Sequence, residues 1–151
     1  MLPLEGVQAS TAICYEVTYP SLIATAVRQG SQLLTTITND GWYGTSSAPY
    51  QHFEMASMRA IEQGRYLVRA ANTGISGIVD PYGQVVERSP IFQEAGIVGE
   101  VRLLTERTVY SKIGDAVAYA SLGIMVLAVL GSGRESLLFS LSGTGRGLRK
   151  K

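Results

Sequence analysis

The residue with the clearest chemical potential in this sequence is Cys14, the only cysteine among 151 residues. It follows Ala9–Ile13, a short run rich in residues that favour β-strands, which predicts a buried strand. Pro20 then stands where a helix would begin, so Cys14 lies in a strand-to-helix turn. Such a turn lifts a side chain above the edge of a sheet, and a nearby helix N-terminus favours the thiolate, a nucleophile that can carry an acyl group. The alternative is a small buried hydrophobic residue, the commoner role of a single cysteine.

Two further loops follow predicted strands and carry polar or aromatic side chains. The strand predicted over 33–38 ends in a loop with two glycines and two aromatic residues, and the strand predicted over 67–71 ends in a turn. In α/β sheets, ligands collect where loops leave the carboxyl ends of strands, so we expect the three loops to converge on one site. The candidates for that site are Cys14, Tyr15, Glu16, Asn39, Asp40, Trp42, Asn72 and Thr73.

Residue type alone leaves some of these roles open. Trp42 and Tyr43 fit a ligand contact and surface packing about equally well. Asp40 could cap a turn. His52, at the start of a predicted helix, is expected to be a structural hydrogen-bonding residue rather than a general base.

The order of predicted elements indicates an α/β fold with a layered sheet. Apolar residues at helical spacing predict helices over 19–29 and from Ala48 to about Tyr66. Between and after them come several runs of the β type, which predict strands over 8–14, 33–38, 67–71, 75–79, 84–88 and 97–101. The order β-α-β-α followed by strands is typical of an α/β layered sheet, and residues 102–114 resemble a linker.

The composition is apolar and poor in charge for a soluble domain, so a membrane segment must be sought. Hydrophobic residues make up 46% and charged residues 17%, with a mean hydropathy of +0.15. A net charge of +1 argues against nucleic-acid binding. One cysteine excludes an intrachain disulfide and, with one histidine, argues against a zinc site, and the N-terminus has no signal-peptide pattern.

A charge-free stretch from Ala116 to Gly133 is the strongest membrane signal. Its eighteen residues are at the lower limit for a helix that spans a bilayer, and a basic tail follows it. We therefore expect a domain over 1–113, a transmembrane helix over 114–133 and a basic cytoplasmic tail over 134–151, with the domain outside the cytoplasm. The alternative is a buried core helix of a soluble protein.

The linked motifs around these loops resemble the nitrilase, or carbon–nitrogen hydrolase, superfamily. Within it, the match over Thr11–Leu130 is most similar to the apolipoprotein N-acyltransferases of bacterial inner membranes, which carry a periplasmic nitrilase-like domain before a last transmembrane helix. The motifs are Ile-Cys-Tyr-Glu at 13–16, Thr-Asn-Asp-Gly-Trp-Tyr-Gly at 38–44, Gln-His-Phe-Glu-Met-Ala-Ser-Met-Arg-Ala-Ile-Glu at 51–62 and Arg-Ala-Ala-Asn-Thr-Gly-Ile-Ser at 69–76.

This resemblance implies a fold, a reaction and a set of roles. The fold is the C-terminal part of a nitrilase-like α-β-β-α sandwich, followed by the membrane helix. The reaction moves a fatty acyl chain from a phospholipid to a cysteine thioester, and then to the N-terminal amine of a diacylglyceryl-cysteine lipoprotein, without a cofactor or metal. Cys14 matches the nucleophile and Glu16 a supporting carboxylate. Tyr15, with Asn39, Asp40 and Trp42, matches positions near the substrate, and the Tyr15 N–H would help to stabilise the oxyanion.

The sequence departs from the family pattern before Cys14. The glutamate and lysine of the Glu-Lys-Cys triad precede the cysteine by long stretches, whereas thirteen residues precede Cys14 and none is a lysine. Glu5 lies outside the matching motif and is not assigned as the base. We therefore expect a fragment that is inactive alone and that needs the missing N-terminal part of the same enzyme as a partner. The alternatives are a soluble nitrilase-type amidase and a non-catalytic, membrane-anchored binding module.

Overall fold

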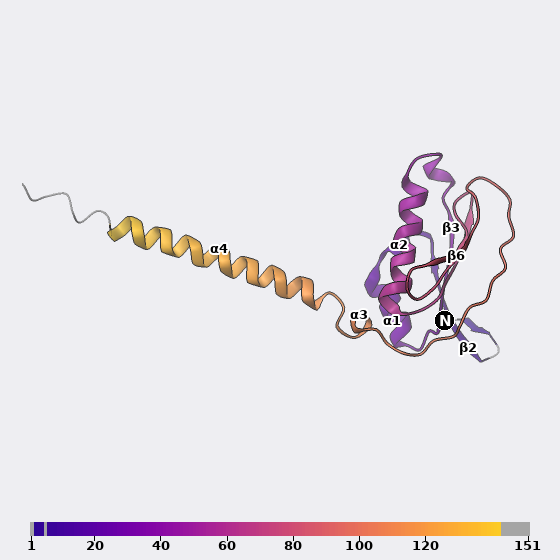
Figure 1. Cartoon of the computed structure of the whole chain (residues 1–151), viewed down its shortest axis with the longest axis horizontal. Coiled ribbons are helices and arrows are strands. Elements are labelled where there is room, and N and C mark those ends of the chain that lie inside the picture. Colours follow the sequence, from indigo (N-terminus) through magenta and orange to yellow (C-terminus); the bar gives the residue numbers. More distant parts are fainter. Residues whose placement is uncertain (1, 5, 143–151) are drawn as a thin grey trace, which may run out of the picture. The chain divides into compact units, whose positions relative to one another are not determined.

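The computed structural model describes the backbone of residues 2–4 and 6–142 and the side chains of residues 6–131. The chain separates into two units, Met1–Ile113 and Gly114–Lys151. The first unit holds every predicted site residue and is built on one mixed sheet (Figure 1).

Six strands lie in the sheet in the order in which they occur along the chain. The three longest, β2, β3 and β4, pair in parallel, while β1, β5 and β6 add antiparallel edges. Parallel neighbours need a crossover, and here each crossover is a helix. The bounds are β1 Leu2–Leu4, β2 Val7–Ile13, β3 Leu33–Asn39, β4 Leu67–Asn72, β5 Gly77–Val79 and β6 Val85–Arg88.

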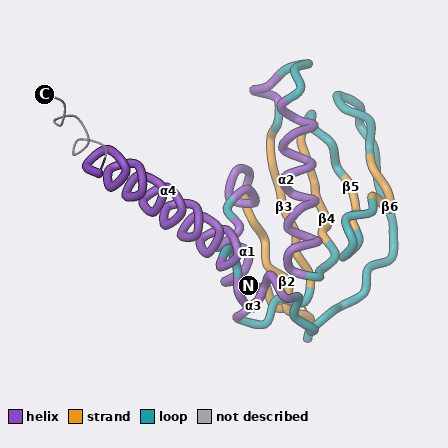
Figure 2. Tube along the Cα trace, turned by 60° about the vertical axis from the view of Figure 1, so that its left-hand side comes forward, coloured by secondary structure: helices purple, strands orange, loops and turns teal. Residues whose placement is uncertain are grey.

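The two crossover helices, α1 (Pro20–Arg28) and α2 (Ala48–Gln63), are placed by their terminal residues. Each has a proline in its first turn, where the missing N–H costs no helical hydrogen bond. Helix α2 ends at Gly64, whose φ of 62° is in the left-handed region that favours glycine. Figure 2 shows α2 in front of β3 and β4, and the apolar core lies between these layers. Its members are Ala12, Val17, Ile23, Val27, Leu34, Phe53, Ala56, Ala60, Leu67, Ile75 and Val79.

The opposite face of the sheet is less well covered. Thr11 and Thr35 pair across β2 and β3 through their hydroxyls, at 2.7 Å. Ile13 and Ile37 pair in the same register and are 59% and 50% exposed. Side chains alternate between the faces of a strand, so these residues mark an apolar face that no described helix covers.

Most of the predicted elements are confirmed, with small shifts at their ends. The short elements that were not predicted are β1, two 3-10 helices in the loops after β2 and β3, and helix α3 (Val109–Ile113), which lies within the expected linker. The strand predicted over 97–101 was wrong, because no strand or helix lies between Arg88 and Val109. Further along the same stretch, the Leu104 N–H donates to the Gln32 carbonyl at 3.3 Å.

The second unit contains one long helix, α4 (Ala116–Ser142). The transmembrane helix predicted over 114–133 falls on α4, and this prediction is not supported. A bilayer span needs about 20 consecutive, mainly apolar residues. In the part of the chain that the structure describes, no helix combines sufficient length with sufficient apolarity. The basic tail predicted over 134–151 begins within α4, and its residues 143–151 lie outside the described part.

Candidate functional site

Cys14 occupies a strained turn immediately after β2. Its φ is 53°, in the left-handed region that residues with a side chain rarely adopt, and it opens the 3-10 helix η1 (Cys14–Thr18). The turn is held by Glu16, whose carboxylate accepts the Ile13 N–H at 2.7 Å, and by Thr18, whose hydroxyl donates to the Tyr15 carbonyl at 2.8 Å. Strain of this kind persists only where the surroundings enforce it, and it concentrates at active sites. The sequence-based placement of Cys14 in a strand-to-helix turn is confirmed.

The register of the parallel strands brings the three predicted loops to one edge of the sheet. Ile13 at the end of β2 pairs with Ile37, and Asn39 at the end of β3 pairs with Asn72 at the end of β4. The backbone N–H of Asp40 also donates to the Asn72 carbonyl at 3.1 Å. The expected convergence of the loops at the carboxyl ends of the strands is therefore confirmed.

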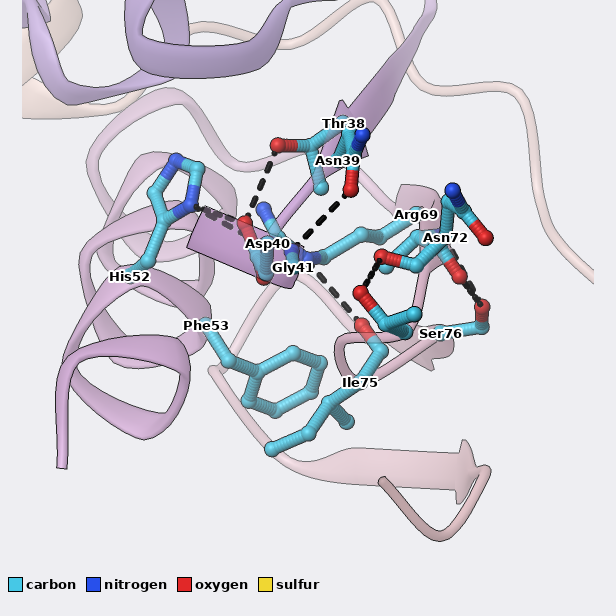
Figure 3. Close-up of polar contacts among 12 residues, drawn as sticks. Thr38, Asn39, Asp40, Gly41, His52, Phe53, Arg69, Asn72, Ile75 and Ser76 are labelled. Atoms are coloured by element: carbon cyan, nitrogen blue, oxygen red, sulfur yellow. Dashed lines mark hydrogen bonds and ion pairs between the residues drawn. The ribbon is translucent and has the colours of Figure 1, made fainter. Parts of the chain in front are cut away.

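Beneath these loops lies a buried group of charged and polar side chains, which we call the Asp40 cluster: Asp40, His52 and Arg69 (Figure 3). Arg69 Nη2 donates to Asp40 Oδ2 at 2.7 Å, and His52 Nδ1 lies 2.9 Å from Asp40 Oδ1. Thr38 Oγ1 donates to Asp40 Oδ1 at 3.1 Å, and Arg69 Nε donates to the Ile75 carbonyl at 3.1 Å. A buried carboxylate and a buried guanidinium are tolerated together because each offsets the other's loss of water.

Burial lowers the pKa of Arg69, while the negative charge of Asp40, the hydrogen bond to Asp40 and the charge of an ionised Cys14 oppose this lowering.

The structure places the other predicted residues in two different settings. Tyr15 is 54% exposed, Trp42 is 85% exposed, and Asn39 and Asn72 are also exposed at the strand ends. Asp40 differs from the expectation of a substrate contact, since its side chain is fully buried and bonded within the cluster. His52 is buried at 4% exposure and bonded to Asp40, which confirms its expected structural hydrogen bond.

Two hollows lie next to these loops. One, of about 450 Å³, is lined by Asn72, Thr73 and polar residues of the chain around Ser89–Glu94. The other, of about 180 Å³, lies between α1 and the sheet and has Glu16 and Leu22 in its walls. Among the described side chains, no three histidine, cysteine or acidic groups gather where they could hold a metal ion.

Sequence reasoning missed Arg69 as a member of the site. The signal was present, because Arg69 interrupts the apolar run of β4. Its pairing register with Thr36, which is buried, places it on the helix-covered face. An arginine on a buried face requires an acidic partner, and Asp40 follows β3, the strand that pairs with β4.

This chain is similar in sequence and in fold to proteins of one known family. The sequence profile of the carbon–nitrogen hydrolase family matches residues 2–111. Among solved structures, the carbon–nitrogen hydrolase from Helicobacter pylori G27 is similar in fold, with a TM-score of 0.54 and 14% identity over 60% of this chain and 39% of the other.

Two curated relatives are more similar in sequence. The apolipoprotein N-acyltransferase of Geobacter metallireducens is 48% identical over 126 residues, which are 83% of this chain and 24% of the relative. That of Pseudomonas aeruginosa is 48% identical over 101 residues, or 67% of this chain and 20% of the relative. The chain thus spans about a quarter or less of the length of these relatives.

Proposed function

Because this chain belongs to the carbon–nitrogen hydrolase family, we propose that it forms the nucleophile-bearing part of an apolipoprotein N-acyltransferase. The observation that carries the proposal is Cys14 itself, held at a φ of 53° where three strand-end loops meet. We infer the acyl-transfer reaction from the names of the relatives and from the resemblance of the motifs.

The first half of the proposed reaction loads Cys14. The Cys14 sulfur attacks the ester carbonyl of a phospholipid, a carbon–sulfur bond forms, and the carbon–oxygen bond to the glycerol breaks. The lysophospholipid leaves with a proton, and a thioester remains on the protein. We assign stabilisation of the oxyanion of the tetrahedral intermediate to the N–H of Tyr15, the residue that follows Cys14 in η1.

The second half transfers the acyl group. The α-amine of a diacylglyceryl-cysteine lipoprotein attacks the thioester carbonyl, a carbon–nitrogen bond forms, and the carbon–sulfur bond breaks to restore the thiol. A thiolate leaves readily, which splits one difficult amide formation into two easier steps. Both substrates carry acyl chains, so we place the reaction at the surface of a bacterial inner membrane.

Within this scheme, we assign two supporting roles. Glu16 shapes the nucleophile turn through its bond to the Ile13 N–H. Trp42, exposed on η2 (Gly41–Tyr43), offers a large amphipathic surface for acyl chains and headgroups on the entry side, together with the exposed Asn39. In the complete protein, the second layer of an α-β-β-α sandwich covers the face that carries Ile13 and Ile37.

The test uses a full-length protein that contains this chain, incubated with phosphatidylethanolamine labelled in its acyl chain. We expect a labelled protein adduct that hydroxylamine releases, and transfer of the label to a diacylated lipopeptide. Cys14→Ala should abolish both, whereas Ser47→Ala, an exposed residue before α2, should change neither. A labelled thioester that survives in Cys14→Ala would refute the assignment, and efficient release of ammonia from small amides would favour an amidase.

A further inference from the structure

The Asp40 cluster links the three loops of the site to one another. Asp40 follows β3, Arg69 lies within β4, and the Ile75 carbonyl that accepts from Arg69 belongs to the loop after β4. Gly74 packs so closely on Asp40 that a Cβ there would lie 2.8 Å from the Asp40 Cβ. The cluster therefore connects the loop after β3 with β4 and with the loop after β4.

Through His52, the cluster also contacts η1, the turn that carries Cys14. The ring of Tyr15 lies over His52 with its centroid 6.3 Å away and an interplanar angle of 38°. The ring of Tyr43 contacts the same histidine edge-on, with the two ring centroids 6.5 Å apart, so the His52 imidazole contacts side chains from two loops. Arg59, about two turns further along α2, donates to the Thr18 carbonyl at 3.4 Å and fastens the other end of η1.

Two buried nitrogen atoms in the cluster have no hydrogen-bond partner among the described residues, namely His52 Nε2 and Arg69 Nη1. In Figure 3, the two ring nitrogens of His52 lie on different sides of the ring, and the dashed contact to Asp40 involves one of them. Buried polar atoms are almost always paired, so each of these two nitrogen atoms calls for an explanation.

From these contacts we propose that His52, held in place by Asp40 and Arg69, is a positioning residue. Its ring packs against Tyr15 and fixes the position of that residue, and this orients the Cys14 sulfur and the Tyr15 N–H toward the acyl carbonyl. This inference rests on the proposed role of Cys14 as an acyl-accepting nucleophile. His52 does not touch the reacting atoms and takes no proton in the reaction. Its effect passes through Tyr15, which is the neighbour of the nucleophile in the chain.

The experiment compares two reactions of Cys14 in the full-length protein in detergent. Acylation by p-nitrophenyl butyrate, followed as single-turnover release of p-nitrophenolate, needs an oriented sulfur and an oxyanion donor. Alkylation by iodoacetamide, quantified on the Cys14 peptide by mass spectrometry, needs only the thiol. We expect Tyr15→Ala and His52→Asn each to slow acylation by about tenfold or more, and to change alkylation by less than about threefold.

A double-mutant cycle shows whether the two residues act together. If His52 acts through Tyr15, the double variant should be no slower in acylation than the slower single variant, rather than about a hundredfold slower as independent effects would give. Tyr82→Ala, which removes an exposed ring from the hairpin between β5 and β6, is the matched control and should leave both rates unchanged.

Several outcomes would overturn the inference. They are equal loss of acylation and alkylation, multiplicative effects in the cycle, or normal acylation in Tyr15→Ala, whose exposed side chain is not needed for folding. The last result decides the matter even if His52→Asn does not fold. A protein that accepts butyrate on Cys14 but never an acyl chain from phospholipid would instead refute the proposed function and leave this inference standing.

Discussion

At the scale of single residues, Cys14 combines its proposed role as the nucleophile with backbone strain. A side chain at a positive φ costs about 1 kcal/mol or more relative to glycine, because the Cβ approaches the carbonyl oxygen. The Glu16 carboxylate and the Thr18 hydroxyl hold the turn in this conformation. The strain at this position therefore lowers stability where the proposed nucleophile follows β2.

The cost of this strain in the free energy of unfolding can be measured with two variants that lack the thiol. We expect Cys14→Gly to be more stable than Cys14→Ala by about 1 kcal/mol, since only glycine relieves the strain at a φ of 53°. Chemical denaturation followed by circular dichroism gives the free energies of unfolding. The control is Glu54, an exposed residue inside α2, where glycine should instead be less stable than alanine by about 1 kcal/mol. Equal stabilities of the two Cys14 variants would show that the turn is not strained.

The proposed contact of Trp42 with acyl chains and headgroups can be tested without disturbing the fold. Its ring is 85% exposed, so Trp42→Ala should change the free energy of unfolding by less than about 0.5 kcal/mol. We expect slower loading of Cys14 from phospholipid but normal alkylation by iodoacetamide, because tryptophan lacks a group that exchanges protons at neutral pH. Normal loading would remove Trp42 from the lipid-binding surface.

At the scale of elements, the site depends on how closely the loops after β3 and β4 approach each other. Gly74 lies directly against the Asp40 side chain, and the contact includes its Oδ2, the oxygen that pairs with Arg69. No residue with a side chain fits there unless Asp40 moves. A shift of Asp40 would weaken its bonds to both His52 and Arg69, which come from two different elements.

Gly74→Ala should therefore be strongly destabilising although it adds only a methyl group. We expect a loss of about 1–3 kcal/mol from overpacking, together with slower acylation of Cys14. Gly96→Ala is the matched control, since a Cβ at Gly96 meets nothing within 4 Å, and should be neutral or slightly stabilising. Thermal and chemical denaturation of the two variants would show the difference. If both glycines tolerate alanine equally, then the close packing of the two loops is not important for stability.

At the scale of the whole molecule, the main feature is apolar surface in each of the two units. In the first unit it is the sheet face that carries Ile13 and Ile37. In the second unit, large apolar side chains of α4 are exposed around the helix, including Leu122, Ile124, Leu127 and Leu130. Contiguous exposed apolar surface marks a site of association, whereas single exposed residues are ordinary.

We therefore expect the chain to self-associate in the absence of detergent, and α4 to contribute to this. The double substitution Ile124→Gln and Leu127→Gln should reduce the average mass measured by sedimentation, because it replaces two exposed side chains of one continuous surface. Val98→Gln, at an isolated exposed position, is the control and should have no effect. An unchanged mass distribution in the double variant would mean that α4 does not drive association.

The sequence by itself determined which strands the three candidate loops follow and that these loops meet. The short β-type runs before Cys14, Asn39 and Asn72 predicted β2, β3 and β4, because alternation and turn residues are local signals that survive folding. Parallel pairing then required those loops to meet at one edge. The local pattern was misleading at residues 97–101, where alternation occurs in a segment that pairs with no strand. For the stretch at 116–133, the absence of charge and the basic tail that follows predicted a membrane span, which the described part of the chain does not support.

Only the tertiary structure decided what the polar residues do. Asp40 was expected near the substrate, but it lies buried between Arg69, 29 positions further along the chain, and His52, 12 positions further along. Cys14 was expected in a turn, but its positive φ depends on Glu16 reaching back to Ile13. Burial and pairing depend on which segments distant in the sequence come together, and no local pattern encodes that. The types of the candidate residues were therefore readable in the sequence, whereas which of them are buried and paired and which are exposed depended on the packing of the sheet against α2.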